Sequence, residues 1–304
     1  MQQGRAGIIA DQLLLAAVAA TAALEFGLLP FLLHVSAGTA VAFVALAALT
    51  APLHYGLMHE TMHGKLFGTE STDRWVGRGL GILLGFPWET MRFGHLAHHS
   101  MNRHSLDRPE VLRNDQAPLP AAVNYYFKLM IGHALSYASM PFAALLPVRT
   151  TVHVLRFMGD GPEVVRLRAR ALRTFTNIKR RNAVRFDLVA IFALFGTAVW
   201  MWGSAWPVFA TCIGARWSVL SLLDNAPHYG MPLDSGLDAR NTSLPRWAQW
   251  LVMNGNYHGI HHHAPQLGWR ELPAAFAHSG ATLEGAWAAA VLRQVRGPVR
   301  LENA

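Results

Sequence analysis

Long apolar runs dominate the pattern of hydrophobic and polar positions along this chain. Four of them, residues 13–33, 38–58, 186–202 and 204–223, approach the ~20 residues that a helix needs to cross a bilayer. Only a few residues separate the two members of each pair. The sequence therefore predicts an all-α, multi-pass membrane protein built from two transmembrane helical hairpins.

The placement of positive charge predicts how these hairpins are oriented. The linkers inside them, at residues 34–37 and around Gly203, contain no lysine or arginine, whereas residues 149–185 are crowded with basic side chains. Because cytoplasmic loops are enriched in Lys and Arg, we expect both termini and all long loops in the cytoplasm. The apolar segment 119–146 is interrupted by polar residues and Pro141. We expect it to be interfacial or re-entrant, since an even number of crossings keeps its two ends on one side.

Composition agrees with a membrane protein. Hydrophobic residues make up 52% of the 304 positions and charged residues only 14%, where a soluble domain would have about a quarter. The net charge of +8 does not indicate nucleic-acid binding, because the arginines flank apolar spans and no DNA- or RNA-reading motif accompanies them. The single cysteine, Cys212, excludes an intramolecular disulfide, a four-thiolate iron–sulfur cluster and a thiolate zinc site.

The chain contains sixteen histidines, which can bind metal in place of cysteine. Eight of them fall into three clusters. The first, HETMH at 59–63, places two histidines four residues apart. The second and third, HLAHH at 95–99 and HGIHH at 258–262, each place histidines at positions i, i+3 and i+4. On a helix this spacing turns the rings toward one face. Two copies of HxxHH and one HxxxH are far more than chance predicts, so the clusters indicate a metal site.

The number of histidines indicates more than one ion. Imidazole is a ligand for iron, zinc, copper and nickel, so ligand type alone does not identify the metal. One zinc ion needs three or four ligands, whereas eight or nine imidazoles suit two ions. The ninth candidate is His228 in DNAPHYG, just beyond the fourth span.

The boxes HETMHG, GHLAHH and NYHGIHHHAPQLGW resemble the three histidine boxes of the membrane fatty acid desaturase superfamily. The order is similar over nearly the whole chain: two spans, box one, box two, two spans, a lone histidine and box three. The segments DRPE after box two and WRELP after box three are similar as well. Gly268 stands where many members have proline, and His263 adds a third consecutive imidazole.

The resemblance implies a diiron centre, with two iron ions as cofactor and O2 as co-substrate. The implied ligands, which are also the implied catalytic residues, are His59, His63, His95, His98, His99, His228, His258, His261 and His262. The implied reaction introduces a double bond into a fatty acyl or similar long-hydrocarbon lipid. Hydroxylation or ketolation of a lipid or carotenoid is the alternative, although box three is closer to the desaturase pattern.

The resemblance also implies partners and a location. With no cysteine set or haem motif in the chain, electrons would come from a separate donor of the ferredoxin, rubredoxin or cytochrome b5 type. We expect one desaturase-like domain over residues 1–304, integral to the bilayer of a bacterial inner membrane. Its histidine-rich catalytic cap would face the cytoplasm.

Two other classes share part of the pattern. Box one matches the H-E-x-x-H signature of zinc proteases, in which Glu60 would be the general base, but that interpretation leaves both HxxHH clusters unused. A metal transporter or store would hold its ligands near the membrane midplane, whereas these clusters lie beyond the ends of the spans.

Weaker expectations concern residues around the boxes. Glu25 and Arg216 lie inside predicted spans, where helix pairing is favoured over a catalytic role. His54, His104 and His263 lie close to the boxes and are candidates to hydrogen-bond a ligand or carry protons, although a structural role is favoured for each. Asn225 and Asn254 are candidates to orient a metal-bound water, and Glu60 to hydrogen-bond a ligating imidazole.

Overall fold

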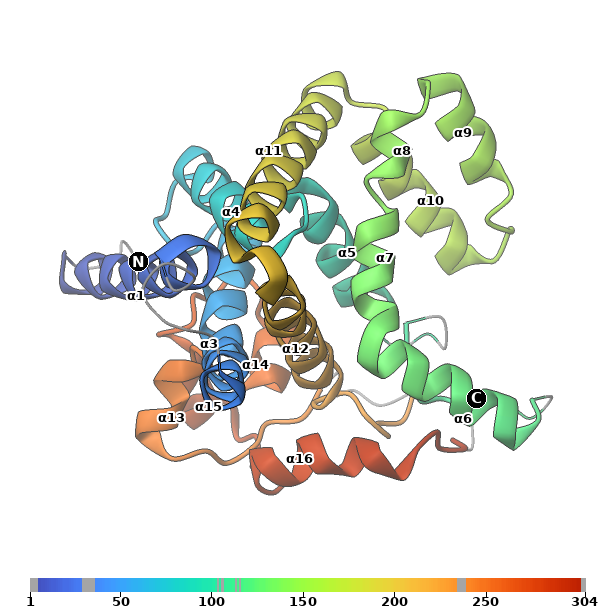
Figure 1. Cartoon of the computed structure of the whole chain (residues 1–304). Coiled ribbons are helices and arrows are strands. Elements are labelled where there is room, and N and C mark those ends of the chain that lie inside the picture. The colour runs from blue at the N-terminus through green and yellow to red at the C-terminus, as the bar shows by residue number, and fades with distance from the viewer. Residues whose placement is uncertain are drawn as a thin grey trace.

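The computed structural model describes residues 5–28, 36–102, 104, 107–112, 114, 116–233 and 239–301. Helices account for most of this part of the chain, and it contains no β-strand, only three isolated bridges. Figure 1 shows long helices crossing one another, with shorter helices of the C-terminal region gathered beneath them. The prediction of an all-α protein is confirmed.

The first two predicted spans correspond to two helices. Helix α1 (Arg5–Ala23) continues into a π-helical turn, η1 (Leu24–Leu28), while the end of the predicted span and the first half of its linker, together residues 29–35, lie outside the described residues. Helix α3 (Ala37–His63) begins at a capping box, in which the Ser36 side chain accepts from the backbone N–H of Thr39. It runs past the predicted end of the span, so its last turn carries box one.

The third and fourth predicted spans correspond to α11 (Ile178–Trp202) and α12 (Trp206–Asn225), joined by the short turn η3 (Gly203–Ala205). Gly203, with φ of 51°, ends α11 in a backbone conformation that glycine adopts easily. Within the described residues, three helical stretches are long and apolar enough to cross a membrane: Gly7–Gly27, Ala37–His63, and Ile178–Asn225, which contains both α11 and α12. The number of hairpins in the bilayer stays a prediction.

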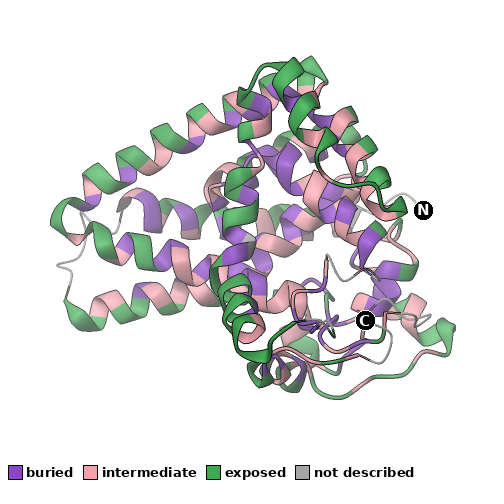
Figure 2. Cartoon of the chain, turned by 90° about the vertical axis from the view of Figure 1, so that its right-hand side faces the viewer, coloured by how far each residue is buried: buried purple, intermediate pink, exposed green. Residues whose placement is uncertain are grey.

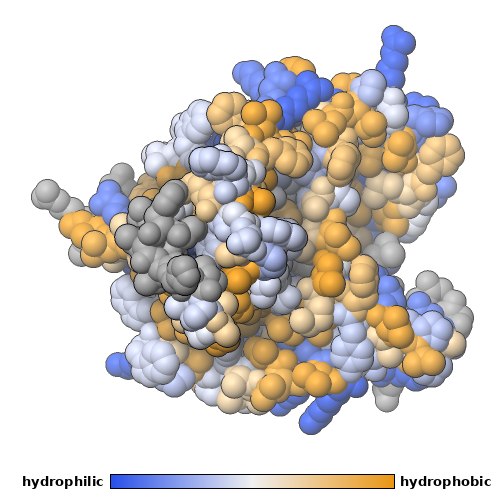
Figure 3. Space-filling view, viewed as in Figure 1, coloured by the Kyte–Doolittle hydropathy of each residue, from blue (hydrophilic) through white to orange (hydrophobic). Residues whose placement is uncertain are grey.

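The long helices expose large apolar side chains. Leu49, Phe192 and Trp200 are examples, and Trp200 is 79% exposed. Figure 2 shows exposed residues along the outer faces of the helices and buried ones where the helices meet, and Figure 3 shows apolar side chains spread over much of one face. Soluble proteins rarely expose so much contiguous apolar surface, so these faces suit contact with lipid.

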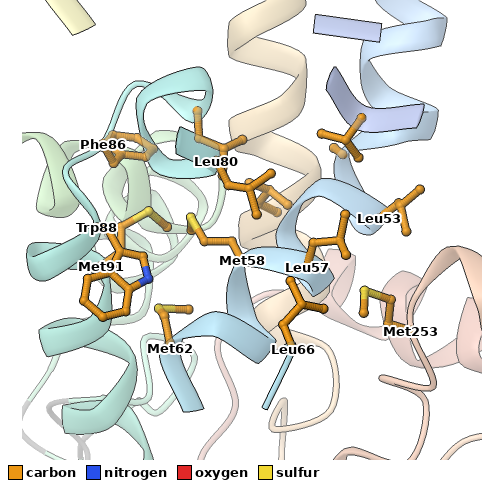
Figure 4. Packing of buried hydrophobic residues seen from close by; sticks show 14 of the residues in the cluster. Leu53, Leu57, Met58, Met62, Leu66, Leu80, Phe86, Trp88, Met91 and Met253 are labelled. Carbon is orange, nitrogen blue, oxygen red and sulfur yellow. The ribbon is translucent and has the colours of Figure 1, made fainter. Parts of the chain in front are cut away.

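A buried core fixes the end of α3 against the next two helices, α4 (Glu70–Leu84) and α5 (Trp88–Met101). Met58, Met62, Leu80 and Trp88 pack together there, as Figure 4 shows. Gly77 permits the close approach, because a Cβ at that position would lie 2.2 Å from Nε1 of Trp88. The core thereby sets box one at a fixed distance from box two.

A buried ion pair joins the first and fourth spans. Arg216 Nη2 lies 2.6 Å from Glu25 Oε2, and both side chains are almost fully buried. His54 completes the cluster: its Nε2 lies 2.9 Å from the Leu80 carbonyl and its Nδ1 3.2 Å from Arg216 Nη1. The carbonyl requires Nε2 to carry the proton, so Nδ1 accepts from the guanidinium. Helix pairing by Glu25 and Arg216 is confirmed, and the partners of His54 agree with the favoured structural role.

The segment predicted to be interfacial or re-entrant is a series of short helices. They are α6 (Pro118–Phe127), the π-helical η2 (Lys128–Gly132), α7 (His133–Ser139) and α8 (Phe142–Leu145). Their outer side exposes Leu119, Phe127, Ile131 and Phe142, while η2 and α7 pack against α12. An exposed apolar side suits lipid, but the depth of this segment in the membrane stays a prediction.

The remaining helices form two groups, one between α8 and α11 in the sequence and one at the C-terminal end of the chain. Helices α9 (Val148–Arg156) and α10 (Pro162–Phe175) follow α8 in the sequence and precede α11. Helix α10 packs against α5. The C-terminal part contains α13 (Arg246–Leu251), α14 (His258–His263), α15 (Leu272–Ser279), α16 (Trp287–Arg293) and the turn η4 (Gln294–Arg296).

Candidate metal centre

The structure brings all nine predicted histidines together. They come from the end of α3, from α5, from the turn after α12 and from α14. Their nitrogens form two groups, each with all ligand atoms within 4.8 Å of one another: the first group is His59, His63, His95, His99 and His261, and the second group is His98, His228, His258 and His262.

Helix geometry explains how the boxes divide between the groups. In box two, His95 and His99 are one turn apart and join the first group, while His98 joins the second. In box three, His258 and His262 join the second group and the middle histidine joins the first. Each HxxHH box thus gives its i and i+4 rings to one group and its i+3 ring to the other.

The nitrogens in each group point at one another. In the first group, Nε2 of His95 lies 2.7 Å from that of His63 and 3.0 Å from that of His99. In the second, Nε2 of His98 lies 3.1 Å from that of His228. One proton can join two such nitrogens, but it cannot satisfy four or five that converge. His59 Nε2 is buried with no hydrogen-bond partner. A cation inside each group would satisfy these lone pairs, so the residues fit two metal ions.

Burial keeps most of these rings neutral. It lowers the pKa of His258 to about 3 and the pKa values of His95, His261 and His262 well below the usual range for histidine, and the neighbouring imidazoles add to the effect. A neutral imidazole has a free lone pair, because a metal ion and a proton compete for the same nitrogen. The site is therefore ready to bind metal at neutral pH.

Asp107 orients one ring of the second group. Its Oδ2 lies 2.6 Å from Nδ1 of His98. Burial lowers the pKa of His98, but the charge and hydrogen bond of Asp107 outweigh this effect and raise that pKa to about 9. A metal ion would have to displace the Nε2 proton of this ring, after which Nδ1–H still donates to the carboxylate and fixes the orientation of the ring. In the sequence, Asp107 stands out only as part of DRPE, and no local pattern predicts this role.

The rest of the DRPE segment holds the lone histidine. Arg108 pairs with Glu110 at 2.6 Å, and both side chains are buried. The Arg108 guanidinium also donates to the backbone carbonyls of His228 and Met231, at 2.5 and 2.9 Å. A loop beside box two thereby positions a histidine more than a hundred residues later in the chain.

Glu60 lies close to a ligating ring, as predicted, but its main partner is elsewhere. Its Oε1 is 3.5 Å from Nδ1 of His59, and its Oε2 accepts from the backbone N–H of Trp269 at 2.9 Å. Trp269 is held by the Asn254 amide, which donates to its carbonyl, and by Asp11, which accepts from its indole N–H. The Asn254 side chain therefore supports the end of box three. Asp11, which no sequence pattern singles out, secures this network from α1.

The other weakly predicted residues lie outside the two groups. Asn225 donates to Gln294 at 2.7 Å and lines a cavity beside the second group. His104 lines a surface depression. His263 is exposed and belongs to neither group, so the third consecutive imidazole of box three is not among the converging rings.

Two cavities reach the histidine cluster from different sides. The first cavity, of about 340 Å³, is lined by His95, His98 and His228 together with Leu129, Tyr137 and Met140. The second cavity, of about 80 Å³, is lined by His59, His258 and His261 together with Met253, Leu272 and Trp287. Asp224 lines both cavities and accepts a hydrogen bond from Tyr55 at 3.0 Å.

The fold and the site together define a helical protein with membrane-length apolar helices and two adjacent groups of imidazoles that can hold metal ions. The family model for fatty acid desaturases matches residues 35–290, and the chain belongs to that family. The match contains every one of the nine histidines. The predicted resemblance is confirmed, and membership implies a metal-dependent oxidoreductase of lipids at the membrane. A comparison with curated proteins found no match.

Replacing Asp107 by Asn is expected to weaken metal binding at the second group about 10- to 100-fold, the usual effect of losing the partner that orients a ligating histidine. The amide keeps the shape of the carboxylate but removes its charge. Titration with competing chelators measures the change. Asp160→Asn, at an exposed carboxylate that pairs with Arg168, is the control. Equal affinity of the two variants would contradict the role of Asp107.

The metal-free protein is expected to lose stability as the pH falls from about 6.5 to about 4.5. An unfolded histidine has a pKa near 6.5, whereas burial holds that of folded His258 at about 3. Between these values only the unfolded chain binds the proton, so stability present above pH ~6.5 is lost as the pH falls. The raised pKa of His98, about 9, has the opposite effect between about pH 6.5 and 9, where stability falls as the pH rises.

Melting temperatures in detergent at three pH values check the prediction. A His258→Asn variant, which removes one such group, should show a shallower slope. A melting temperature that stays constant or rises on acidification would contradict it.

Proposed function

We propose that this protein is an O2-dependent diiron desaturase that introduces a double bond into a fatty acyl or similar long-hydrocarbon lipid. The observation that supports it most is the pair of imidazole groups, five and four rings, side by side at the ends of apolar helices. A five-imidazole group is unlike the tetrahedral sites of zinc proteins. In the protease alternative, Glu60 would activate water, but it is buried against Trp269.

The first group would hold one iron ion and the second group the other. When bound, the two ions supply the redox chemistry that lets O2 oxidise an unactivated carbon–hydrogen bond. The protein holds the rings in place through Asp107, Arg108 and Glu60, and it keeps bulk water from the cluster by burying most of the ligands.

The electron balance requires a separate donor. Desaturation takes two electrons and two protons from the substrate, whereas reduction of O2 to two water molecules takes four of each. Two electrons and two protons must therefore come from outside. Cys212, the single cysteine, is buried, so the chain has no thiolate cluster to store them. This supports a separate donor such as a ferredoxin, a rubredoxin or a cytochrome b5.

The cavities suit a chain that passes beside the cluster. A methylene in the first cavity would lie beside His98 and His228, with Leu129 and Met140 giving an apolar wall. The hydrogen bond between Tyr55 and Asp224 lies where the two cavities adjoin. The exposed apolar faces of the long helices place such a substrate within reach of the bilayer.

Hydroxylation or ketolation of a lipid or carotenoid is the second candidate. The first cavity is also lined by Asp107, Ser221, Asp224 and Asn225, which can hydrogen-bond a product that retains oxygen. For the whole chain we propose one domain, anchored by two hairpins in a bacterial inner membrane, with the histidine-rich cap in the cytoplasm. The crowding of basic residues in 149–185 supports that orientation.

Mass spectrometry of lipids tests the reaction. The protein is expressed with a compatible donor, beside a His98→Ala, His261→Ala variant that lacks one ligand from each group. A lipid that has lost two hydrogens only with the intact protein supports desaturation, and one that has gained an oxygen supports hydroxylation. An unchanged lipid profile despite two bound, reducible iron ions would overturn both.

A further inference from the structure

The histidine cluster has a third side that neither cavity reaches. His63 and His99, both in the first group, line neither the first nor the second cavity. Both line an open depression of about 480 Å³ on the protein surface, and both are half-buried. One group of the candidate metal centre therefore approaches the surface on a side away from the proposed substrate path.

The rim of this depression is basic. Lys65 and Arg170 line it, and Gln266 adds a polar side chain. On α10, Arg166, Arg170 and Arg173 follow at intervals of four and three residues, which places them on one side of the helix. A second depression, of about 300 Å³, adjoins the first at His99 and is lined by Arg166 and by Glu163, which pair with each other.

Electron transfer between proteins slows steeply with distance, so a donor must dock where its centre comes nearest to the metal. The side lined by His63 and His99 meets this requirement, because these imidazoles would themselves be ligands. Complementary charge steers small redox proteins to such places, and their complexes are usually small and transient. Lys65 and Arg170 give the site the charge that attracts an acidic surface.

We propose that the basic depression formed by Lys65, Leu96, Arg170 and Gln266 around His63 and His99 is the docking site for a small acidic one-electron donor protein. This inference rests on the proposed function, since only an oxidase that needs outside electrons uses such a site. Each docked donor gives one electron, so two dockings deliver the two electrons that the balance requires.

The test compares two variants with the same change in charge. Lys65→Glu with Arg170→Gln alters the depression, and the glutamine keeps an N–H donor for the Leu96 carbonyl that Arg170 contacts. Arg149→Glu with Arg156→Gln alters two exposed arginines on α9 that line neither depression. The probe is an acidic [2Fe–2S] ferredoxin, and its Kd and its rate of electron delivery are measured at low and high salt.

The depression variant is expected to bind ferredoxin about tenfold more weakly or worse, with a flatter salt dependence. Its iron content and its reduction by dithionite should be those of the unaltered protein, because dithionite does not need the docking site. The α9 variant should bind ferredoxin normally. Equal losses in both variants, or none, would overturn the proposal.

A further arm separates the donor from a charged substrate head group. If coenzyme A, as a soluble anionic head group, binds the unaltered protein, displaces ferredoxin and loses affinity only in the depression variant, the site belongs to the substrate and the proposal is overturned. Failure of the proposed function looks different: the unaltered protein would then hold no iron that dithionite reduces, whatever its affinity for ferredoxin.

Discussion

A His261→Ala variant is expected to lose lipid oxidation and about one of two bound iron ions per chain, whereas His263→Ala, two residues away, keeps both. His261 is buried and its Nε2 lies 3.1 Å from that of His99 in the first group, while His263 is exposed and belongs to neither group. Losing a partner of a ligating histidine costs about 10- to 100-fold in affinity or activity. Losing the ligand itself should therefore cost more than ~100-fold in activity.

Iron analysis and product formation, measured together, check this prediction. His262→Ala provides the matched change in the second group and should remove the other ion. Circular dichroism shows whether each variant keeps its helices. If His263→Ala were as damaging as His261→Ala, or if His261→Ala kept two ions and full activity, the division of the rings into two groups would be wrong.

Arg216→Met is expected to destabilise the protein by about 3–5 kcal/mol, because it leaves the Glu25 carboxylate buried without its partner. The arginine is 1% exposed and extends from α12 toward η1 and α3, where it contacts Glu25 and His54. The double variant Glu25→Leu, Arg216→Met should recover most of the loss, since apolar side chains often replace a buried ion pair at little cost.

Unfolding by denaturing detergent measures these differences. Arg166→Met is the control, because its partner Glu163 forms a pair at the protein surface, where such a pair contributes about 0–1 kcal/mol. If Arg216→Met were as stable as the double variant, the prediction would be wrong. That result would mean that Glu25 is solvated or neutral once Arg216 is absent.

The helices and the set of converging histidines followed closely from the sequence. Apolar runs of membrane length predicted α1, α3, α11 and α12, because a helix satisfies its own backbone within the bilayer. The i, i+3, i+4 spacing predicted that each box would present its rings together. The proline and polar interruptions in 119–146 likewise agree with the short helices seen there.

Residues that support the site were harder to predict, since their partners are distant in sequence. Asp107 reaches His98 across a loop, and Asp11 reaches Trp269 across most of the chain. A single aspartate in a loop or near the start of a span is not part of a periodic pattern, so the sequence does not reveal its partner. Asn254 shows the same limit, because its place beside box three gives no sign that its amide donates to the Trp269 carbonyl.

The sequence by itself determined which side chains are available and which of them share a helix face, because local spacing fixes direction along a helix. Only the tertiary structure decided that His95 and His99 lie with His261 in the first group. It also placed His98 with His258 and His262 in the second group. Rings at i and i+3 diverge by about 60° around the helix axis, so one box can serve two ions only where helices from distant parts of the chain meet. The packing of α3, α5 and α14 creates that meeting, and no local pattern specifies it.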